Sequence, residues 1–192
     1  MLIDFVDMEK DIPAILGIYG EYIDSSITFE YHLPTLEEMA ERIRTISSDY
    51  PYIVLRNDDG SVVGYAYAHR VFERSAYQFD AEATIYLSKS VSGKGYGRLL
   101  YEKLFPILEK MGIRNLYALV TEENGNSISF HEKMGFSRFA RFENVGYKCS
   151  RWLSVVWLRK VISPFTHPAI PLIPFSSLPE AWCLSILRGD QE

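Results

Sequence analysis

Cysteine is scarce in this chain, since Cys149 and Cys183 are the only two among 192 residues. Two cysteines are too few for a disulfide framework, so we expect free thiols in a reducing compartment. A hydrophobic run long enough to span a bilayer is also absent, and no basic segment followed by an apolar one marks a signal peptide near the first residue. We therefore expect a cytoplasmic protein without a membrane partner.

An excess of positive charge is missing too. The chain carries 20 Lys and Arg residues against 25 Asp and Glu residues, which gives a net charge of −5. This balance argues against a general nucleic-acid binder, although it says nothing about a local basic pocket. Hydrophobic residues make up 47% of the chain and charged residues 23%, which is the composition of a globular protein with its own core.

Proline is sparse until the C-terminal end, where five of the nine prolines fall within the last thirty residues or so. We predict one domain over residues 1–163 and an extended, proline-rich tail over residues 164–192. Ser177 and Glu180 could cap a short helix in that tail. We expect the helix to dock on its own domain or on a second subunit, because it is strongly apolar on one side. Its apolar side chains would be Trp182, Ile186 and Leu187.

Hydrophobic periodicity predicts an alternation of strands and helices. The predicted strands cover residues 1–7, 51–56, 62–70, 80–87, 115–120, 136–142 and 152–162, and the predicted helices cover 11–25, 35–48, 96–111 and 126–134. Asp11 is a plausible N-cap, and Thr35 with Glu38 forms a capping box at the start of the second helix. Pro106 lies inside the third helix and predicts a kink or a local break, since a mid-helix proline costs about 3 kcal/mol.

The glycine-rich turn between the fourth strand and the third helix is the main chemical signal. Gly93, Gly95 and Gly97 remove Cβ atoms, and Lys94 and Arg98 add positive charge at the same place. A strand that runs through such a turn into a helix aims backbone N–H groups at a phosphate. The Walker pattern is absent, and the Rossmann pattern lacks its third glycine. The turn therefore predicts either another kind of phosphate site or an ordinary strand-to-helix connection.

Two motifs and the order of elements resemble the GCN5-related N-acetyltransferase (GNAT) family. Residues 92–97 (SGKGYG) resemble its Q/R-x-x-G-x-G/A pyrophosphate loop, with Ser92 at the Gln/Arg position, and residues 124–136 (NGNSISFHEKMGF) resemble its second signature. The likeness covers about residues 1–163. Within the family the chain looks most like the phosphinothricin and methionine sulfone/sulfoximine acetyltransferases, although Leu153-Ser154 replaces their usual His-Asp pair.

The resemblance implies an α/β (α+β) fold with a mixed, mostly antiparallel sheet of about seven strands. Helices would cover both faces, and strands four and five would splay apart to admit acetyl-CoA. The chain would be an N-acetyltransferase that acts on the amine of a small amino-acid-like molecule, as a homodimer and without a metal. The residues expected to hold the cofactor are Ile85, Tyr86, Leu87, Gly93, Lys94, Gly95, Tyr96, Gly97, Arg98 and Asn124.

Two residues are expected to carry the chemistry. Glu82 lies among apolar neighbours in the fourth strand, where burial would raise its pKa toward neutrality, and we predict that it is a water-mediated general base. Asp80, on the same strand face, competes for that role. The resemblance implies that His131 protonates the leaving thiolate or forms a hydrogen bond with the cofactor. The alternative is that His131 has only a structural role.

The acceptor site is expected to pair a carboxylate with an arginine, because the guanidinium forms a planar fork. The candidates for contact with the acceptor are Arg74 first, then Tyr77, Lys148 and Phe29. Two alternatives stay open. The acceptor amine could belong to a polyamine, an antibiotic or a protein N-terminus, or the chain could be a CoA-binding module without catalysis. Retention of Glu82 and His131 argues against the second alternative, since a pure binder needs neither.

Overall fold

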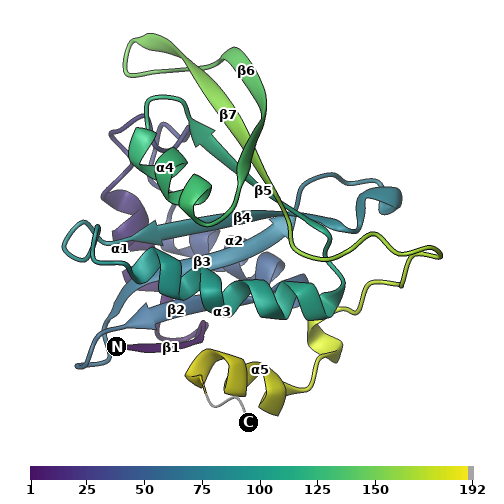
Figure 1. Ribbon diagram of the computed structural model, residues 1–192. Coiled ribbons are helices and arrows are strands. Elements are labelled where there is room, and N and C mark those ends of the chain that lie inside the picture. The colour runs from purple at the N-terminus through teal and green to yellow at the C-terminus, as the bar shows by residue number, and fades with distance from the viewer. Residues whose placement is uncertain (190–192) are drawn as a thin grey trace.

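The computed structural model describes residues 1–189, and its centre is one seven-stranded sheet with the strand order β1-β2-β3-β4-β5-β7-β6 (Figure 1). All neighbouring strands run antiparallel except β4 and β5, which are parallel. This is the mixed, mostly antiparallel sheet that the sequence predicts. The strands are β1 (Leu2–Phe5), β2 (Tyr52–Arg56), β3 (Val62–Arg70), β4 (Asp80–Leu87), β5 (Asn115–Thr121), β6 (Ser137–Lys148) and β7 (Arg151–Val161).

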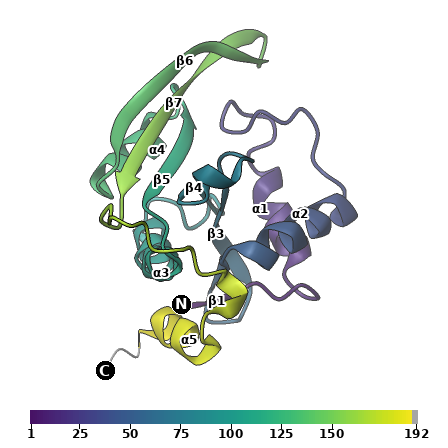
Figure 2. The same ribbon diagram turned by 90° about the vertical axis from the view of Figure 1, so that its right-hand side faces the viewer.

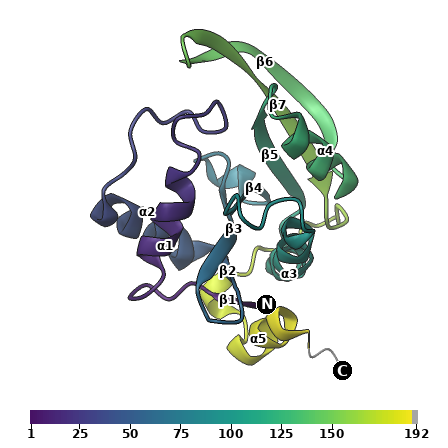
Figure 3. The same cartoon turned by 90° about the vertical axis from the view of Figure 1, so that its left-hand side faces the viewer.

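Helices cover both faces of the sheet. The helices are α1 (Ile12–Gly20), α2 (Leu36–Asp49), α3 (Tyr96–Met111), α4 (Gly125–Lys133) and α5 (Glu180–Arg188), with short 3-10 turns at η1 (Ser75–Tyr77) and η2 (Phe175–Ser177). Figures 2 and 3 show α1 and α2 on one face and α3 and α4 on the other. None of these helices within the described residues is long and apolar enough to cross a bilayer.

The alternation of side chains along the central strands divides the core in two. On β3, Ala66 and Ala68 are fully buried toward α3, and their small size lets that helix approach the sheet. Tyr65 and Tyr67 point to the opposite face, where they pack in the cluster formed with α1 and α2. Successive strand residues point to opposite faces, so a strand that alternates alanine with tyrosine builds a flat face and an aromatic face.

Strands β4 and β5 pair over a short stretch and then part. Within the described chain, their parallel pairing comprises Asp80 with Asn115, Ala81 with Leu116 and Glu82 with Tyr117. Beyond Glu82, β4 continues to pair with β3, and β5 continues to pair with β7. The two strands are therefore each held on one side while they diverge on the other, which is the splay that the resemblance implies (Figure 1).

The first helix is shorter than its periodicity predicts. It ends at Gly20, and residues 21–24 continue as turns held by i→i+3 bonds such as Tyr22 N–H to the Tyr19 carbonyl. Asp11 occupies the N-cap position, but its carboxylate does not cap the helix. It is 2% exposed and accepts two hydrogen bonds from Arg56 at 2.8 and 2.7 Å. A bidentate guanidinium satisfies a buried carboxylate better than one backbone N–H does.

Helices α2 and α3 follow their predicted bounds closely. Thr35 and Glu38 form the predicted capping box, with each side chain bonded to the other residue's backbone N–H. The sequence predicts a kink or a local break at Pro106, and of these two the local break does not occur, because helix α3 runs unbroken through the proline. The buried side chains on either side of that proline, among them Leu104 and Ile107, hold the helix on the sheet and offset its missing hydrogen bond.

Strand β6 is longer than predicted, because it extends to Lys148 rather than ending near residue 142. The register shifts between Phe142 and Gly146, where Asn144 has a positive φ of 48°. The polar residues at this register shift look like a turn in the sequence, but β6 continues beyond them to Lys148. The true turn is formed by Cys149 and Ser150, which both have positive φ.

The tail docks on its own domain. Helix α5 lies against β1 and α3, and its Ile186 and Leu187 are 5% and 3% exposed (Figure 2). The predicted short helix thus exists, although no side chain caps its first turn in the described structure. Both cysteines are free, with Cys149 exposed in the hairpin turn and Cys183 buried in α5.

Candidate active site

The glycine turn presents the open N-terminus of α3 at the C-terminal end of β4. Gly93 and Gly95 have φ values of +77° and +87°, which L side chains rarely adopt, and Gly95 is the N-cap of the helix. Within the described residues no side chain caps α3, so the N–H groups of its first turn face outward. Gly97 has another role, because a Cβ there would lie 3.2 Å from the Phe130 ring. The turn therefore has the geometry of an anion site.

The two cations of the turn are exposed and already paired. Lys94 Nζ donates to the Ser90 carbonyl at 3.0 Å, so its ammonium folds back over the turn. Arg98 Nε lies 2.6 Å from Glu102 Oε1 on the next helical turn. Exposed interactions of this kind contribute little free energy and are easily broken. Both side chains can therefore turn toward an anion at the helix N-terminus.

The divergence of β4 from β5 leaves one edge of β4 without a partner strand. Ser88 N–H donates to the Val63 carbonyl on β3 at 2.8 Å. Because backbone groups alternate in direction along a strand, those of Tyr86 also point to β3, whereas those of Ile85 and Leu87 point into the splay. The main chain of Tyr86 is thus committed to β3, which corrects the expectation that all three residues pair with a cofactor.

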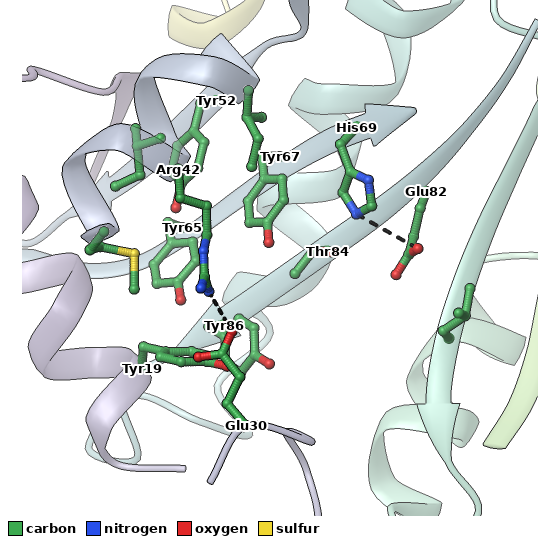
Figure 4. Close-up of a pocket in the computed structure, with 14 residues that line it drawn as sticks. Tyr19, Glu30, Arg42, Tyr52, Tyr65, Tyr67, His69, Glu82, Thr84 and Tyr86 are labelled. Carbon is green, nitrogen blue, oxygen red and sulfur yellow. Dashed lines mark ion pairs between the residues drawn. The ribbon is translucent and has the colours of Figure 1, made fainter. Parts of the chain in front are cut away.

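A cavity of about 250 Å³ opens on the α1 and α2 face of the sheet, beside the splay (Figure 4). Its walls come from both diverging strands, since Thr84 belongs to β4 and Leu119 to β5. A molecule in this cavity can therefore meet one that lies between the strands. The lining residues that carry polar groups are Tyr19, Glu30, Arg42, Tyr52, Tyr65, Tyr67, His69, Glu82, Thr84 and Tyr86.

Glu82 is the carboxylate at the β4 wall of this cavity. Its side chain is 20% exposed and lies 3.6 Å from His69 Nε2, measured to Oε2 (Figure 4). Burial raises the pKa of Glu82 above its ordinary value, and the charge of His69 opposes that shift. Asp80 does not line the cavity, and Asn115 Nδ2 donates to its Oδ1 at 2.6 Å. The geometry therefore favours Glu82 over Asp80 as a base.

The opposite side of the cavity is aromatic and carries an ion pair. Burial raises the pKa of Tyr67 to about 12 and also raises that of Tyr86, so both phenols stay neutral hydrogen-bond donors at physiological pH. Arg42 on α2 reaches Glu30 in the loop after α1, with Nη1 and Oε1 2.8 Å apart. The cavity is thus bounded by a carboxylate at one end and by a guanidinium at the other (Figure 4).

His131 lies on the other face of the sheet and is 3% exposed. Its Nδ1 is 2.8 Å from the Ser127 carbonyl, and its Nε2 is 3.0 Å from the Tyr101 hydroxyl. A carbonyl only accepts, so Nδ1 carries the proton and Nε2 accepts from the tyrosine. Burial lowers the pKa of His131, which keeps the ring neutral. The Nε2 bond therefore links α4 to α3, whereas the Nδ1 bond lies within α4, and proton donation from His131 to a thiolate stays a prediction.

Lys148 is also a structural residue in this arrangement. It is 7% exposed, and its Nζ donates to the carbonyls of Ile23 and Thr28 at 2.6 and 2.7 Å. These two bonds tie the loop after α1 to the end of β6. Tyr31 adds a second tie, since its hydroxyl donates to the Tyr147 carbonyl. Two of the three ammonium protons of Lys148 are thus used within the protein, and its contact with an acceptor stays a prediction.

The remaining predicted acceptor residues lie outside the cavity wall. Arg74 and Tyr77 belong to the loop between β3 and β4, and Tyr77 packs on Phe72 with ring centroids 4.8 Å apart. Phe29 is 39% exposed and lies against Gly146, where a Cβ would strike its ring. None of these three residues lines the cavity.

Asn124 caps α4. Its side-chain oxygen accepts from the Ser127 N–H at 3.2 Å. Cofactor contact through its amide nitrogen is compatible with that bond, because the amide group has separate donors and acceptor.

Sequence reasoning missed His69, Arg42 and the tyrosines of the cavity. The signal for Tyr65, Tyr67 and His69 was their spacing of two along a strand, which places all three on one face. The sequence carried no comparable signal for Arg42, because its partner Glu30 lies in a different element.

Comparison with known proteins finds similarity to acetyltransferases. Residues 7–157 match the family described as the acetyltransferase (GNAT) domain. The phosphinothricin N-acetyltransferase of Alcaligenes faecalis is 32% identical over 158 residues, which cover 81% of this chain and 80% of that protein. The L-methionine sulfoximine/L-methionine sulfone acetyltransferase of Pseudomonas aeruginosa is 28% identical over 80% of this chain and 91% of its own length.

Among solved structures, a GNAT-superfamily phosphinothricin acetyltransferase from Sinorhizobium meliloti in complex with acetyl-CoA superposes with a TM-score of 0.81. It is 30% identical and covers 90% of this chain and 97% of its own.

Proposed function

The chain belongs to the GNAT acetyltransferase family, and on that premise we propose that it moves an acetyl group from acetyl-CoA to the amine of a small amino-acid-like acceptor. One observation carries the proposal: a cavity with a partly buried carboxylate, Glu82, lies beside the gap between β4 and β5 and is lined by residues of both strands. The gap suits the pantetheine arm, and the cavity suits the acceptor. Relatives named for phosphinothricin and methionine sulfoximine acetylation support an acceptor of that type.

Acetyl-CoA would be held by main-chain groups more than by side chains. Its pyrophosphate would lie at the N-terminus of α3, against the N–H groups of Tyr96, Gly97 and Arg98. Its pantetheine would pair along the open edge of β4 at Ile85, as an added strand does, whereas the Leu87 carbonyl already accepts from the Tyr22 hydroxyl at 2.6 Å. Lys94 and Arg98 would add charge at the phosphates, and Asn124 would bond a pantetheine amide.

The transfer itself needs a free amine and a polarised carbonyl. Glu82 would take one proton from the acceptor ammonium through a water, and the amine nitrogen would attack the thioester carbon. The N–H of Leu87, which points into the splay, would stabilise the oxyanion. As the C–S bond breaks, the second amine proton would pass to the departing thiolate. Each turnover thus yields an amide, free CoA and one proton left on Glu82.

The acceptor is proposed to be a small molecule that carries a carboxylate. A volume of about 250 Å³ holds an amino-acid analogue more readily than a folded polypeptide. Arg74 remains the proposed partner of the carboxylate, with Tyr77 and Phe29 at the rim. The loop of Phe29 borders the cavity through Glu30, and loops move more easily than strand walls.

We also propose a homodimer. The β6–β7 hairpin projects from the body of the molecule, and apolar side chains are exposed on it (Figure 1). They are Phe139, Phe142, Val145, Tyr147 and Trp152, each at least 47% exposed. An apolar surface of this kind marks an interface. Sedimentation at micromolar concentration measures the mass directly, and a single species of 22.1 kDa would refute the dimer.

The decisive experiment follows CoA release with a thiol reagent across a panel of amines, which includes amino-acid analogues, polyamines, an aminoglycoside and a peptide N-terminus. We expect the highest kcat/KM for a carboxylate-bearing α-amine. Acetyl-CoA binding without turnover of any amine would leave only a CoA-binding module. In the same assay, Glu82→Gln should lower kcat by about 100-fold or more, the usual share of a general base, and should not change acetyl-CoA affinity. The matched control is Asp80→Asn.

A further inference from the structure

His69 lies beside the proposed base and is not used in the transfer described above. We propose that His69 is a positioning residue that keeps Glu82 ionised and carries the proton released in each turnover from Glu82 to solvent. This inference rests on the proposed function, because it concerns the fate of the proton that acetyl transfer leaves behind.

The register between β3 and β4 places His69 next to Glu82. His69 on β3 stands directly opposite Glu82 on β4, and both side chains point to the cavity face (Figure 4). Cross-strand partners of this kind have Cβ atoms about 5 Å apart, close enough for their side chains to meet. The separation of 3.6 Å between Nε2 and Oε2 is within ion-pair range and slightly longer than a direct hydrogen bond. A small rotation of either side chain, or one water, closes it.

The other ring nitrogen sets the direction of proton flow. His69 Nδ1 is 3.0 Å from the carbonyl oxygen of Arg70, an atom that can only accept. Nδ1 therefore carries a proton in the neutral ring, and Nε2 presents its lone pair to Glu82. The structure thus places a proton acceptor against the carboxyl group that has just been protonated.

The exposed fractions of the two side chains indicate that the proton leaves the site through His69. The Glu82 side chain is 20% exposed, whereas that of His69 is 34% exposed. A proton moves from the carboxyl Oε2 to Nε2, which turns a neutral acid and a neutral imidazole into a carboxylate and an imidazolium. The imidazolium then releases its Nε2 proton to water at the exposed ring edge. No co-reactant is required, and Glu82 is again a base.

The phenols around the pair do not compete for the proton. Tyr67 on β3, Tyr117 on β5 and Tyr101 on α3 each have a pKa raised by burial. They remain neutral at any pH at which Glu82 and His69 exchange a proton. Of the three, Tyr67 lines the cavity, whereas the Tyr101 hydroxyl bonds His131 on the other face of the sheet.

The charged groups nearby are already engaged. Arg42 on α2 pairs with Glu30 across the cavity. Asp80, two residues before Glu82 on the same strand, accepts from Asn115 at 2.6 Å. When His69 is protonated, its imidazolium is therefore the charge that opposes the effect of burial on the pKa of Glu82.

The test is the pH profile of His69→Gln, which keeps a polar side chain of similar size but cannot hold a proton. We expect kcat to fall about tenfold, because the relay supplies a minor part of general acid–base catalysis. We expect the acid limb of kcat/KM to move to higher pH, since Glu82 loses the neighbouring cation. The KM for acetyl-CoA should not change. His167→Gln in the exposed tail makes the same substitution elsewhere and should match wild type.

A second readout works within the folded variant itself. Added imidazole buffer should raise kcat of His69→Gln several-fold and leave that of the wild type unchanged, because the buffer replaces the missing acceptor. A purely structural His69 would lower activity with no shift of the acid limb and no response to buffer, and either result overturns the proposal. Glu82→Gln measured in parallel separates the role of Glu82 as the base from the role of His69 as the relay. Full activity of Glu82→Gln would rule out Glu82 as the base. An inactive Glu82→Gln together with a wild-type pH profile of His69→Gln would rule out the role of His69 alone.

Discussion

Replacing Lys148 with methionine tests whether the buried ammonium supports the loop after α1 or meets the acceptor. Its Nζ makes two bonds, to the carbonyls of Ile23 and Thr28 at 2.6 and 2.7 Å. Hydrogen bonds to a charged group contribute about 1.5–3 kcal/mol each, or about 3–6 kcal/mol for the pair. The ammonium also bears a cost for leaving water, which methionine does not, so the net loss should be about 2–4 kcal/mol.

Chemical denaturation and thermal melting measure this loss. For a chain of this size, 1 kcal/mol corresponds to about 2–4 °C, so Lys148→Met should melt about 4–16 °C lower. The KM for the amine should rise because the loosened loop borders the cavity, and acetyl-CoA affinity should stay constant. Lys160→Met is a matched control, since Lys160 Nζ donates to one carbonyl, that of Met134, at 2.8 Å. It should lose about half as much stability and keep the amine KM.

One result would refute the structural role of Lys148. If Lys148→Met unfolds within about 1 kcal/mol of wild type while the amine KM rises tenfold or more, the ammonium contacts the acceptor directly. The loop would then need another anchor, and Tyr31 would be the next residue to test.

Three further outcomes are expected. Gly95→Val forces a side chain into a φ of +87° at the N-cap of α3 and should abolish acetyl-CoA binding in calorimetry, whereas Gly125→Ala, which has open space around its Cβ, should bind normally. Arg74→Ala should raise KM for a carboxylate-bearing amine and not for its decarboxylated analogue; an equal rise for both would end its proposed role. Burial lowers the pKa of His131, so the unfolded state binds more protons below about pH 6.5, and the melting temperature should fall as pH drops from 6.5 through the folded-state value. His131→Gln should flatten that fall.

Local patterns in the sequence predicted most of the elements, because caps, turns and periodicity act over a few residues. The capping box of Thr35 and Glu38 and the positive φ of Gly95 required only their neighbours in the chain. The errors came where distant contacts prevailed. Asp11 reads as an N-cap, but Arg56, 45 residues away, binds its carboxylate. The break expected at Pro106 is absent, because the buried face of α3 holds the helix together.

The sequence by itself determined the family, the order of strands and helices, the glycine turn and the candidate base Glu82. Each depends on residues that are close together in the chain or on a motif of fixed spacing. The tertiary structure decided which side chains share the cavity. It placed the Lys148 ammonium against two backbone carbonyls and His131 outside the cavity, and it brought His69 to 3.6 Å from Glu82. The physical reason is that a side chain's partners follow from strand register and sheet order, and one residue of slip would send Glu82 to the opposite face.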